Sequence, residues 1–224
     1  MDPSSINEAA WPVDSEEARA ATRSARVMTL LNRRAHDRMR DAAFKAKTAP
    51  QRLLWVQRAA DLVVQAVLAA DAAACRRGCN HCCHIAVQVT QVEAEAIAKS
   101  TGRPMVKAPA DALRPAEVEE WGGVKTALDA SKRRSVAQYH GVRCPFLSSQ
   151  GDCVVYEVRP LACRYHYNIG DDAEGCRLSV DGSEGPPANI FMLNNLTMLA
   201  GDALALGVHQ PVADIREWFP TDSA

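Results

Sequence analysis

The stretch Cys75-Arg-Arg-Gly-Cys79-Asn-His-Cys82-Cys83 places four cysteines within nine residues. The other four cysteines follow in a looser run, at Cys144, Cys153, Cys163 and Cys176. A Cys-x-x-Cys turn such as Cys79 to Cys82 brings two thiolates to one side of the backbone, as zinc or an iron–sulfur cluster requires. A need for small apolar residues would instead scatter cysteines through the core. The two blocks therefore predict a metal site.

Length and composition limit the class of protein. At 224 residues with eight cysteines, the chain can bury a full core without disulfides, and its cysteine density is below that of disulfide frameworks. Residues 1–10 are polar and acidic rather than a charged-then-apolar leader, and the apolar run from Leu62 to Ala70 is too short to span a bilayer. We therefore expect a cytoplasmic protein whose thiols stay reduced unless metallated. Disulfide pairing after export is the alternative that an even cysteine count leaves open.

The N-terminal part is expected to form a helical hairpin over residues 15–74, behind a disordered tail at residues 1–14. Apolar residues recur at three- and four-residue spacing before the break at Thr48-Ala-Pro50, and again after it. Pro50 suits the first turn of the second helix. The apolar face of that helix consists of Leu53, Val56, Ala60, Val63, Val67 and Ala74. Two antiparallel helices are therefore predicted, the second ending near Gly78.

Residues 75–185 are expected to form a loop-rich metal-binding domain. Thr90-Gln-Val-Glu93 has the pattern of a capping box, and it predicts a helix that ends at Gly102. Another helix is predicted over residues 116–140. The segment Cys153-Val-Val-Tyr156 is a candidate for a short strand.

A last helix is expected to begin at Pro186-Pro187, within a segment 186–224 that packs on the metal-binding domain. Its apolar residues are Ile190, Phe191, Leu193, Leu196, Met198 and Leu199. A short piece from Val212 to Phe219 follows. The predicted fold class is mostly α, with an N-terminal helical hairpin, a loop-rich cysteine-cluster domain and a C-terminal helix.

The adjacent cysteines constrain the metal. Cys82 and Cys83 point in different directions on most backbones, so both can bind one tetrahedral zinc only with strain, which favours a polynuclear site or cluster. Four ligands confined to the first block would also be crowded, so we expect ligands from both blocks to meet. The candidates, in order of preference, are Cys79, Cys82, Cys83 and Cys163, then Cys144, Cys153 and Cys176, with Cys75 last. Alternatives for a missing thiolate are His81, His84 and His166.

Two arginines are candidates for contact with the cofactor. Arg159 and Arg164 bracket Pro160 and Cys163 in an otherwise apolar segment. Cationic neighbours lower the pKa of a thiol and offset the negative charge of a thiolate site. We therefore expect Arg159 and Arg164 beside the bound group, whereas most other arginines are expected to face solvent.

These motifs resemble the YkgJ-type cysteine-cluster family, whose pattern is Cys-x-x-Cys-x-x-Cys-Cys, then Cys-Pro-Phe-Leu, then Cys-x-Ile-Tyr-Glu-x-Arg-Pro-x-x-Cys-Arg. The matching stretches are Cys79-Asn-His-Cys82-Cys83, Cys144-Pro-Phe-Leu147 and Cys153-Val-Val-Tyr156-Glu-Val-Arg159-Pro160-Leu-Ala-Cys163-Arg164. The resemblance covers about Cys75 to Leu178 and implies a zinc- or iron-chelating domain. Cys75 departs from the family's spacing by one residue. A flagellin lysine methylase with a similar cysteine pattern favours iron–sulfur over zinc, without implying methyl transfer.

Three functions are consistent with these residues. The first is a cytosolic metal-binding protein that holds an iron–sulfur cluster or zinc and acts in electron transfer, metal handling or sensing. The second is a metal-dependent enzyme that modifies a protein or small molecule, with Tyr156, His166 or a free cysteine near the metal. The third is a structural-zinc adaptor whose helices bind a partner protein.

Charge patterning bears on the partners. Nine lysines and arginines lie between Ala18 and Lys47, and four acidic residues accompany them, which is typical of a solvated helix face. With a formal net charge of −1, the chain has no overall attraction to nucleic acid or membrane. We therefore expect a protein or redox partner of unknown identity, with no nucleic acid and no membrane. Pairing of the hairpin into a homodimer is left open.

Overall fold

Helices dominate the fold, as the hydrophobic spacing predicts. The computed structural model describes residues 15–73, 78–107, 109–114, 124–171, 176, 190–191 and 210–221. Within these ranges, no helix combines the length and the apolar character needed to cross a membrane. The predictions made for the tail at residues 1–14 and for Cys75 lie outside the described residues.

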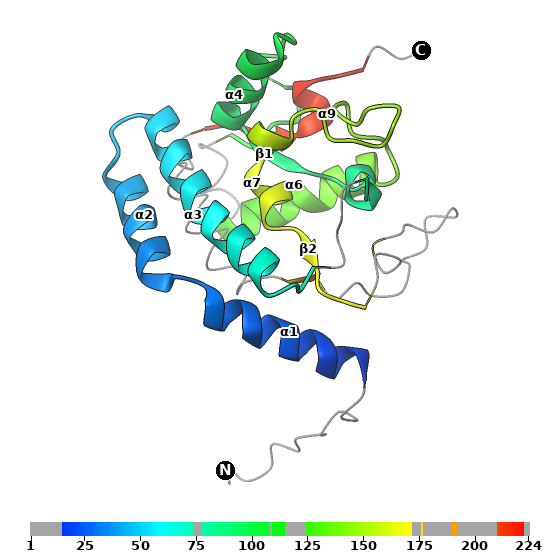
Figure 1. Cartoon of the computed structure of the whole chain (residues 1–224). Helices are drawn as coiled ribbons and strands as arrows, with labels where there is room; N and C mark the ends of the chain where they lie inside the picture. Colours follow the sequence, from blue (N-terminus) through cyan, green and yellow to red (C-terminus); the bar gives the residue numbers. More distant parts are fainter. Residues whose placement is uncertain are drawn as a thin grey trace, which may run out of the picture.

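The N-terminal part contains three helices, α1 (Glu16–Leu30), α2 (Arg33–Lys45) and α3 (Ala49–Ala69). The prediction of a single helix before Pro50 is wrong, because the chain breaks between α1 and α2. The Asn32 side chain accepts a hydrogen bond from the Ala35 N–H and so begins a new helix. Pro50 lies in the first turn of α3, as predicted. The antiparallel hairpin consists of α2 and α3, which lie side by side (Figure 1).

Helix α3 packs both against the other N-terminal helices and against the cysteine-bearing half. The predicted apolar face is buried at Leu53, Val56, Ala60, Val63 and Val67. One part of this face packs with Val27 of α1, and another part packs with Val92 and Leu161 in the cysteine-bearing half. The helix ends at Ala69, earlier than the predicted Gly78, and Asp71 follows with a φ of 49°.

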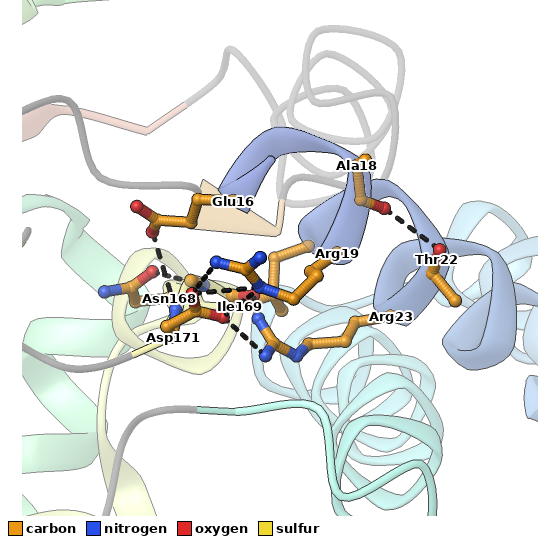
Figure 2. A network of polar contacts seen from close by, with 9 residues as sticks. Glu16, Ala18, Arg19, Thr22, Arg23, Asn168, Ile169 and Asp171 are labelled. Carbon is orange, nitrogen blue, oxygen red and sulfur yellow. Dashed lines mark hydrogen bonds and ion pairs between the residues drawn. The ribbon is translucent and has the colours of Figure 1, made fainter. Parts of the chain in front are cut away.

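Exposed charged side chains join α1 to the segment between Cys163 and Cys176 (Figure 2). Asp171 accepts hydrogen bonds from Arg19 and from Arg23, whose Nη2 lies 2.7 Å from the carboxylate. Arg23 also donates to the Ile169 carbonyl at 2.8 Å. The two arginines hold the pKa of Asp171 down to about 2. This contact complements the apolar packing of α1 on α3.

A two-stranded sheet joins the middle of the chain to its C-terminal part. Strand β1 (Gln88–Thr90) pairs antiparallel with β4 (Val212–Asp214), with Val89 opposite Ala213. Helix α4 (Gln91–Thr101) follows β1, and helix α9 (Ile215–Trp218) follows β4. The predicted capping box at the start of α4 is present, and Gly102 ends the helix with a φ of 70°. The shared core consists of Val89, Ile97, Phe146, Ile215, Trp218 and Phe219.

The cysteine-bearing segments are short and irregular. They contain the 3-10 helix η1 (His81–His84), the 3-10 helix η2 (Tyr156–Val158) and helix α7 (Leu161–Arg164), and the longer helix α6 (Val124–Tyr139) lies between η1 and η2 in the chain. The strand predicted at Cys153 to Tyr156 is wrong, because Cys153 makes one isolated bridge to Leu147 and the chain then turns into η2.

A second small sheet corrects another prediction. Strand β2 (Tyr167–Asn168) pairs antiparallel with β3 (Ile190–Phe191). The helix predicted to begin at Pro186 includes Ile190 and Phe191, and at these two residues the prediction is wrong. The rest of that predicted helix lies outside the described residues. Long-range pairing replaces local helical hydrogen bonds at this point.

Candidate metal centre

The first cysteine block is held in a tight turn. Cys82 and Cys83 lie in η1, and the Cys83 N–H donates to the Asn80 carbonyl at 2.9 Å. The loop before η1 packs against the glycine turn that precedes Cys153. A Cβ on Gly151 would lie 2.9 Å from Nδ2 of Asn80, and Gly151 has a φ of +86°. Glycine at this position therefore allows the two cysteine-bearing loops to approach closely.

A backbone hydrogen bond joins the two cysteine blocks directly. The Cys144 N–H donates to the Cys83 carbonyl at 2.7 Å, and the Gly141 N–H donates to the His84 carbonyl at 2.8 Å. Beyond Cys144 the chain makes a narrow hairpin in which Leu147 bridges to Cys153. Cys144 and Cys153 are thus brought together with η1 by main-chain geometry, independently of any metal.

The third element of the site is α7, which carries Cys163. Its first turn is held by Glu93, whose carboxylate accepts hydrogen bonds from the N–H of Leu161 at 2.8 Å and from Thr90. Glu93 is 4% exposed, and burial raises the pKa of its carboxyl. This side chain therefore has two roles, because it caps α4 and also positions the helix of Cys163.

The pKa values of the thiols depend on one another across the two cysteine blocks. Burial raises the pKa of Cys163 well above its usual value, and Cys82, Cys144 and Cys153 raise it further. A hydrogen bond with Cys83, followed by burial, raises the pKa of Cys82. Burial is also the first cause of the raised pKa values of Cys144 and Cys153. Four thiols from both blocks therefore oppose one another's ionisation.

This donor set fits a thiophilic cation. Several thiolates close together in an apolar setting need a compensating positive charge, which zinc or the iron of a cluster supplies. Among the described side chains, no three cysteine, histidine, aspartate or glutamate residues converge as a metal cage. The backbone hydrogen bond between Cys144 and Cys83 therefore brings the two cysteine-bearing loops together without aligning their sulfur atoms as a cage. Binding requires their sulfur atoms to turn toward a common centre.

The two predicted arginines occupy different positions. The charge of Arg159 lowers the pKa values of Cys82, Cys153 and Cys163, against the effect of burial. Its guanidinium lies 4.1 Å from the Tyr156 ring centroid, and its Nε is buried with no hydrogen-bond partner in the described structure. Arg159 is therefore the arginine beside the thiols.

Arg164 holds the backbone of the segment that carries Arg159. It donates to the carboxylate of Asp61 in α3 at 2.7 Å and to the carbonyl of Arg159 at 3.1 Å, and it also reaches the Glu157 carbonyl. Its guanidinium thus ties the backbone of the Arg159 segment to α3 rather than facing the sulfur atoms.

The remaining candidates differ in their exposure and surroundings. Cys79 and Cys176 are half-buried, and Cys75 lies outside the described residues. All seven described cysteines are free of disulfides. Burial, followed by Lys132, lowers the pKa of His166.

Sequence reasoning missed two residues near the first block. Arg216 donates to the carbonyls of Cys83 and Val142, and it pairs with the fully buried Asp214. An acidic and a basic residue two positions apart are common on protein surfaces, so no pattern distinguished this pair. Their role follows from β4 and α9, which carry Asp214 and Arg216 into the core.

One comparison with known proteins found a match. A family model described as "CxxCxxCC: Putative zinc- or iron-chelating domain" matches residues 74–177, the segment that contains all eight cysteines. Searches of curated proteins and of solved structures found no match.

Proposed function

We propose that thiols of both cysteine blocks hold an iron–sulfur cluster or zinc, with the cluster favoured, because residues 74–177 match the CxxCxxCC family model. The observation that carries this proposal is the place of the half-buried Cys163 in the core that also contacts Cys144 and Cys153, where Cys82, Cys144 and Cys153 help to raise the pKa of its thiol. The ligand set we propose comprises these four cysteines, with Cys83 and Cys79 as further ligands from the first block.

Two features support a cluster over a single zinc ion. Cys82 and Cys83 are adjacent and lie in one turn, so a second metal or a bridging position uses both thiols with less strain. Arg159 also brings a buried N–H donor without a partner among the described residues, and such donors commonly bond to the sulfur atoms of clusters. A bound cluster supplies one-electron chemistry, whereas bound zinc supplies a structural cross-link.

Residues around the cysteines supply apolar surroundings and a positive charge at the proposed site. Phe146 and Val155 shield the thiols from water on one side, since Cys144, Cys153 and Cys163 pack against their core. Arg159 offsets the negative charge that several thiolates bring together. We propose a redox or metal-handling role in the cytoplasm for the loaded protein.

A structural-zinc adaptor is the second candidate, and exposed apolar side chains favour it. Phe44 of α2, with Leu54 and Leu68 of α3, are 49%, 47% and 65% exposed. A partner protein that binds the helical hairpin would cover such residues.

The test is metal analysis of the full chain purified without oxygen. Iron and acid-labile sulfide with broad visible absorption support the cluster, whereas a colourless protein with stoichiometric zinc supports the adaptor. Cys163→Ser and Cys82→Ser are expected to lower the metal content. Ser135→Ala, a substitution at a buried serine in α6, is the control that keeps it. Wild-type protein without bound metal, or full loading of both cysteine variants, contradicts the proposal.

A further inference from the structure

A buried arginine that donates hydrogen bonds to the backbone of both cysteine-bearing segments lies outside the matched domain. Arg216 in α9 is 7% exposed, and Asp214, its partner at the end of β4, is 0% exposed. Their carboxylate and guanidinium lie 2.9 Å apart. A buried ion pair is retained at a cost in desolvation, so its remaining hydrogen bonds indicate what it positions.

Those hydrogen bonds converge on the junction of the two cysteine blocks. Arg216 donates through Nε to the Val142 carbonyl at 3.1 Å and through Nη2 to the Cys83 carbonyl at 3.3 Å. The same Cys83 carbonyl accepts the N–H of Cys144. One guanidinium therefore binds the backbone of the first block and the backbone just before Cys144.

Asp214 sets the position of that guanidinium. Its carboxylate accepts the N–H of Val87 at 2.7 Å and the N–H of Arg216 at 3.0 Å. The N–H of Ile215 donates to the Val87 carbonyl at 3.0 Å. Val87 lies between η1 and β1. These hydrogen bonds therefore fix the position of the Asp214–Arg216 pair relative to the segment that directly follows the first cysteine block.

We propose that Arg216 is a positioning residue of the metal centre, so that the metal-binding unit extends beyond residues 74–177 to include β4 and α9. The planar guanidinium donates in fixed directions to two carbonyls and a carboxylate at once, which the single ammonium of lysine cannot reproduce. Arg216 acts on Cys83 and Cys144 through their backbone. This inference rests on the proposed function, because the role assigned to Arg216 is to support metal ligands.

The test compares Arg216→Lys with Ile97→Val, a core substitution in α4. Ile97 is fully buried in the same core, and its apolar side chain has no hydrogen bond with the cysteine loops. After metal loading without oxygen, the rate of metal transfer to a chelator is measured, together with the urea midpoint of metal-free protein. We expect Arg216→Lys to release metal about ten- to a hundredfold faster, as for other residues that orient ligands. Ile97→Val should release it at the wild-type rate. A wild-type rate in Arg216→Lys, or equal release from both variants at equal loss of stability, overturns the inference.

A metal-free measurement separates this inference from the proposed function. Alkylation of reduced, metal-free protein is followed at each cysteine by mass spectrometry. We expect Arg216→Lys to speed labelling of Cys83 and Cys144 relative to Ile97→Val, and equal labelling overturns the positioning role even in a protein that binds no metal. If Arg216→Lys does not fold, the double variant Asp214→Asn/Arg216→Gln removes both charges together and is measured in the same way.

Discussion

Two aspartates of this protein form ion pairs with arginines, and the burial of the two pairs differs more than their geometry. The Asp214–Arg216 pair has side chains that are 0% and 6% exposed, with a separation of 2.9 Å. Asp171 and Arg23 lie 2.7 Å apart, but their side chains are 37% and 29% exposed. Exposed pairs contribute little because water and salt screen them, whereas a broken buried pair leaves an uncompensated charge. Similar distances therefore predict very different consequences of mutation.

The largest effect is expected for Asp214→Ala. Removal of the carboxylate leaves the Arg216 guanidinium buried without its partner, and the N–H of Val87 loses its acceptor. We expect the free energy of unfolding to fall by about 3–5 kcal/mol, measured by urea denaturation. Asp171→Ala is the matched control at the exposed pair. An equal fall in both variants would contradict the role of burial in this comparison.

Glu93→Gln tests a buried carboxylate whose donors are two N–H groups and a hydroxyl, without an arginine. The amide has one acceptor oxygen and cannot serve Leu161 and Thr90 as the carboxylate does. We expect a loss of about 1–3 kcal/mol in urea denaturation and a lower metal content, because α7 carries Cys163. Retention of full stability would show that these hydrogen bonds to the buried carboxylate contribute little here.

Glu217 tests an intermediate case, since it is half-buried. Burial first, and then Asp214 and Asp111, raise the pKa of its carboxyl to about 7. The folded state therefore binds more protons than the unfolded state between about 4.5 and about 7. The stability that the folded state gains from this proton binding is fully present at low pH, and it is lost as the pH rises through that range. After allowance for solvent screening it amounts to about 1 kcal/mol at most. Glu217→Gln is expected to flatten the pH dependence of stability over this range, and an unchanged slope would count against it.

The smallest effect is expected for Asp171→Asn. Because Arg19 and then Arg23 lower the pKa of Asp171 to about 2, its stabilising effect is present at neutral pH and is lost only as the pH falls from about 3.8 toward 2. Exposure makes that effect small, so we expect no measurable change in the urea midpoint at neutral pH and physiological salt. A large, salt-insensitive loss would place this contact in the same class as Asp214–Arg216.

The features predicted correctly are those that short-range patterns specify. The buried face of α3 follows from apolar spacing, and the start of α4 follows from Thr90 and Glu93. The break at Asn32 was missed because apolar spacing continues across it, although the side chain of Asn32 begins a new helix. Local propensity cannot distinguish a helix interior from a cap when both suit the same residues.

The features that were missed depend on partners far away in the chain. Strands β1 and β4 are three residues each, too short for an alternating pattern, and each depends on the other for its hydrogen bonds. The clustering of cysteines predicted which residue types gather at the site. The supporting residue Arg216 could not be identified, because only the tertiary fold buries it.

The hydrogen bond between Arg216 and Cys83 has a consequence for the order of events during protein synthesis. The two residues are separated by 133 positions. At usual rates of translation, Cys83 leaves the ribosome on the order of ten seconds before Arg216 is made. During that time the first cysteine block lacks its hydrogen bond from Arg216. We therefore expect a nascent chain that ends before Arg216 to bind metal with lower affinity than the full-length protein.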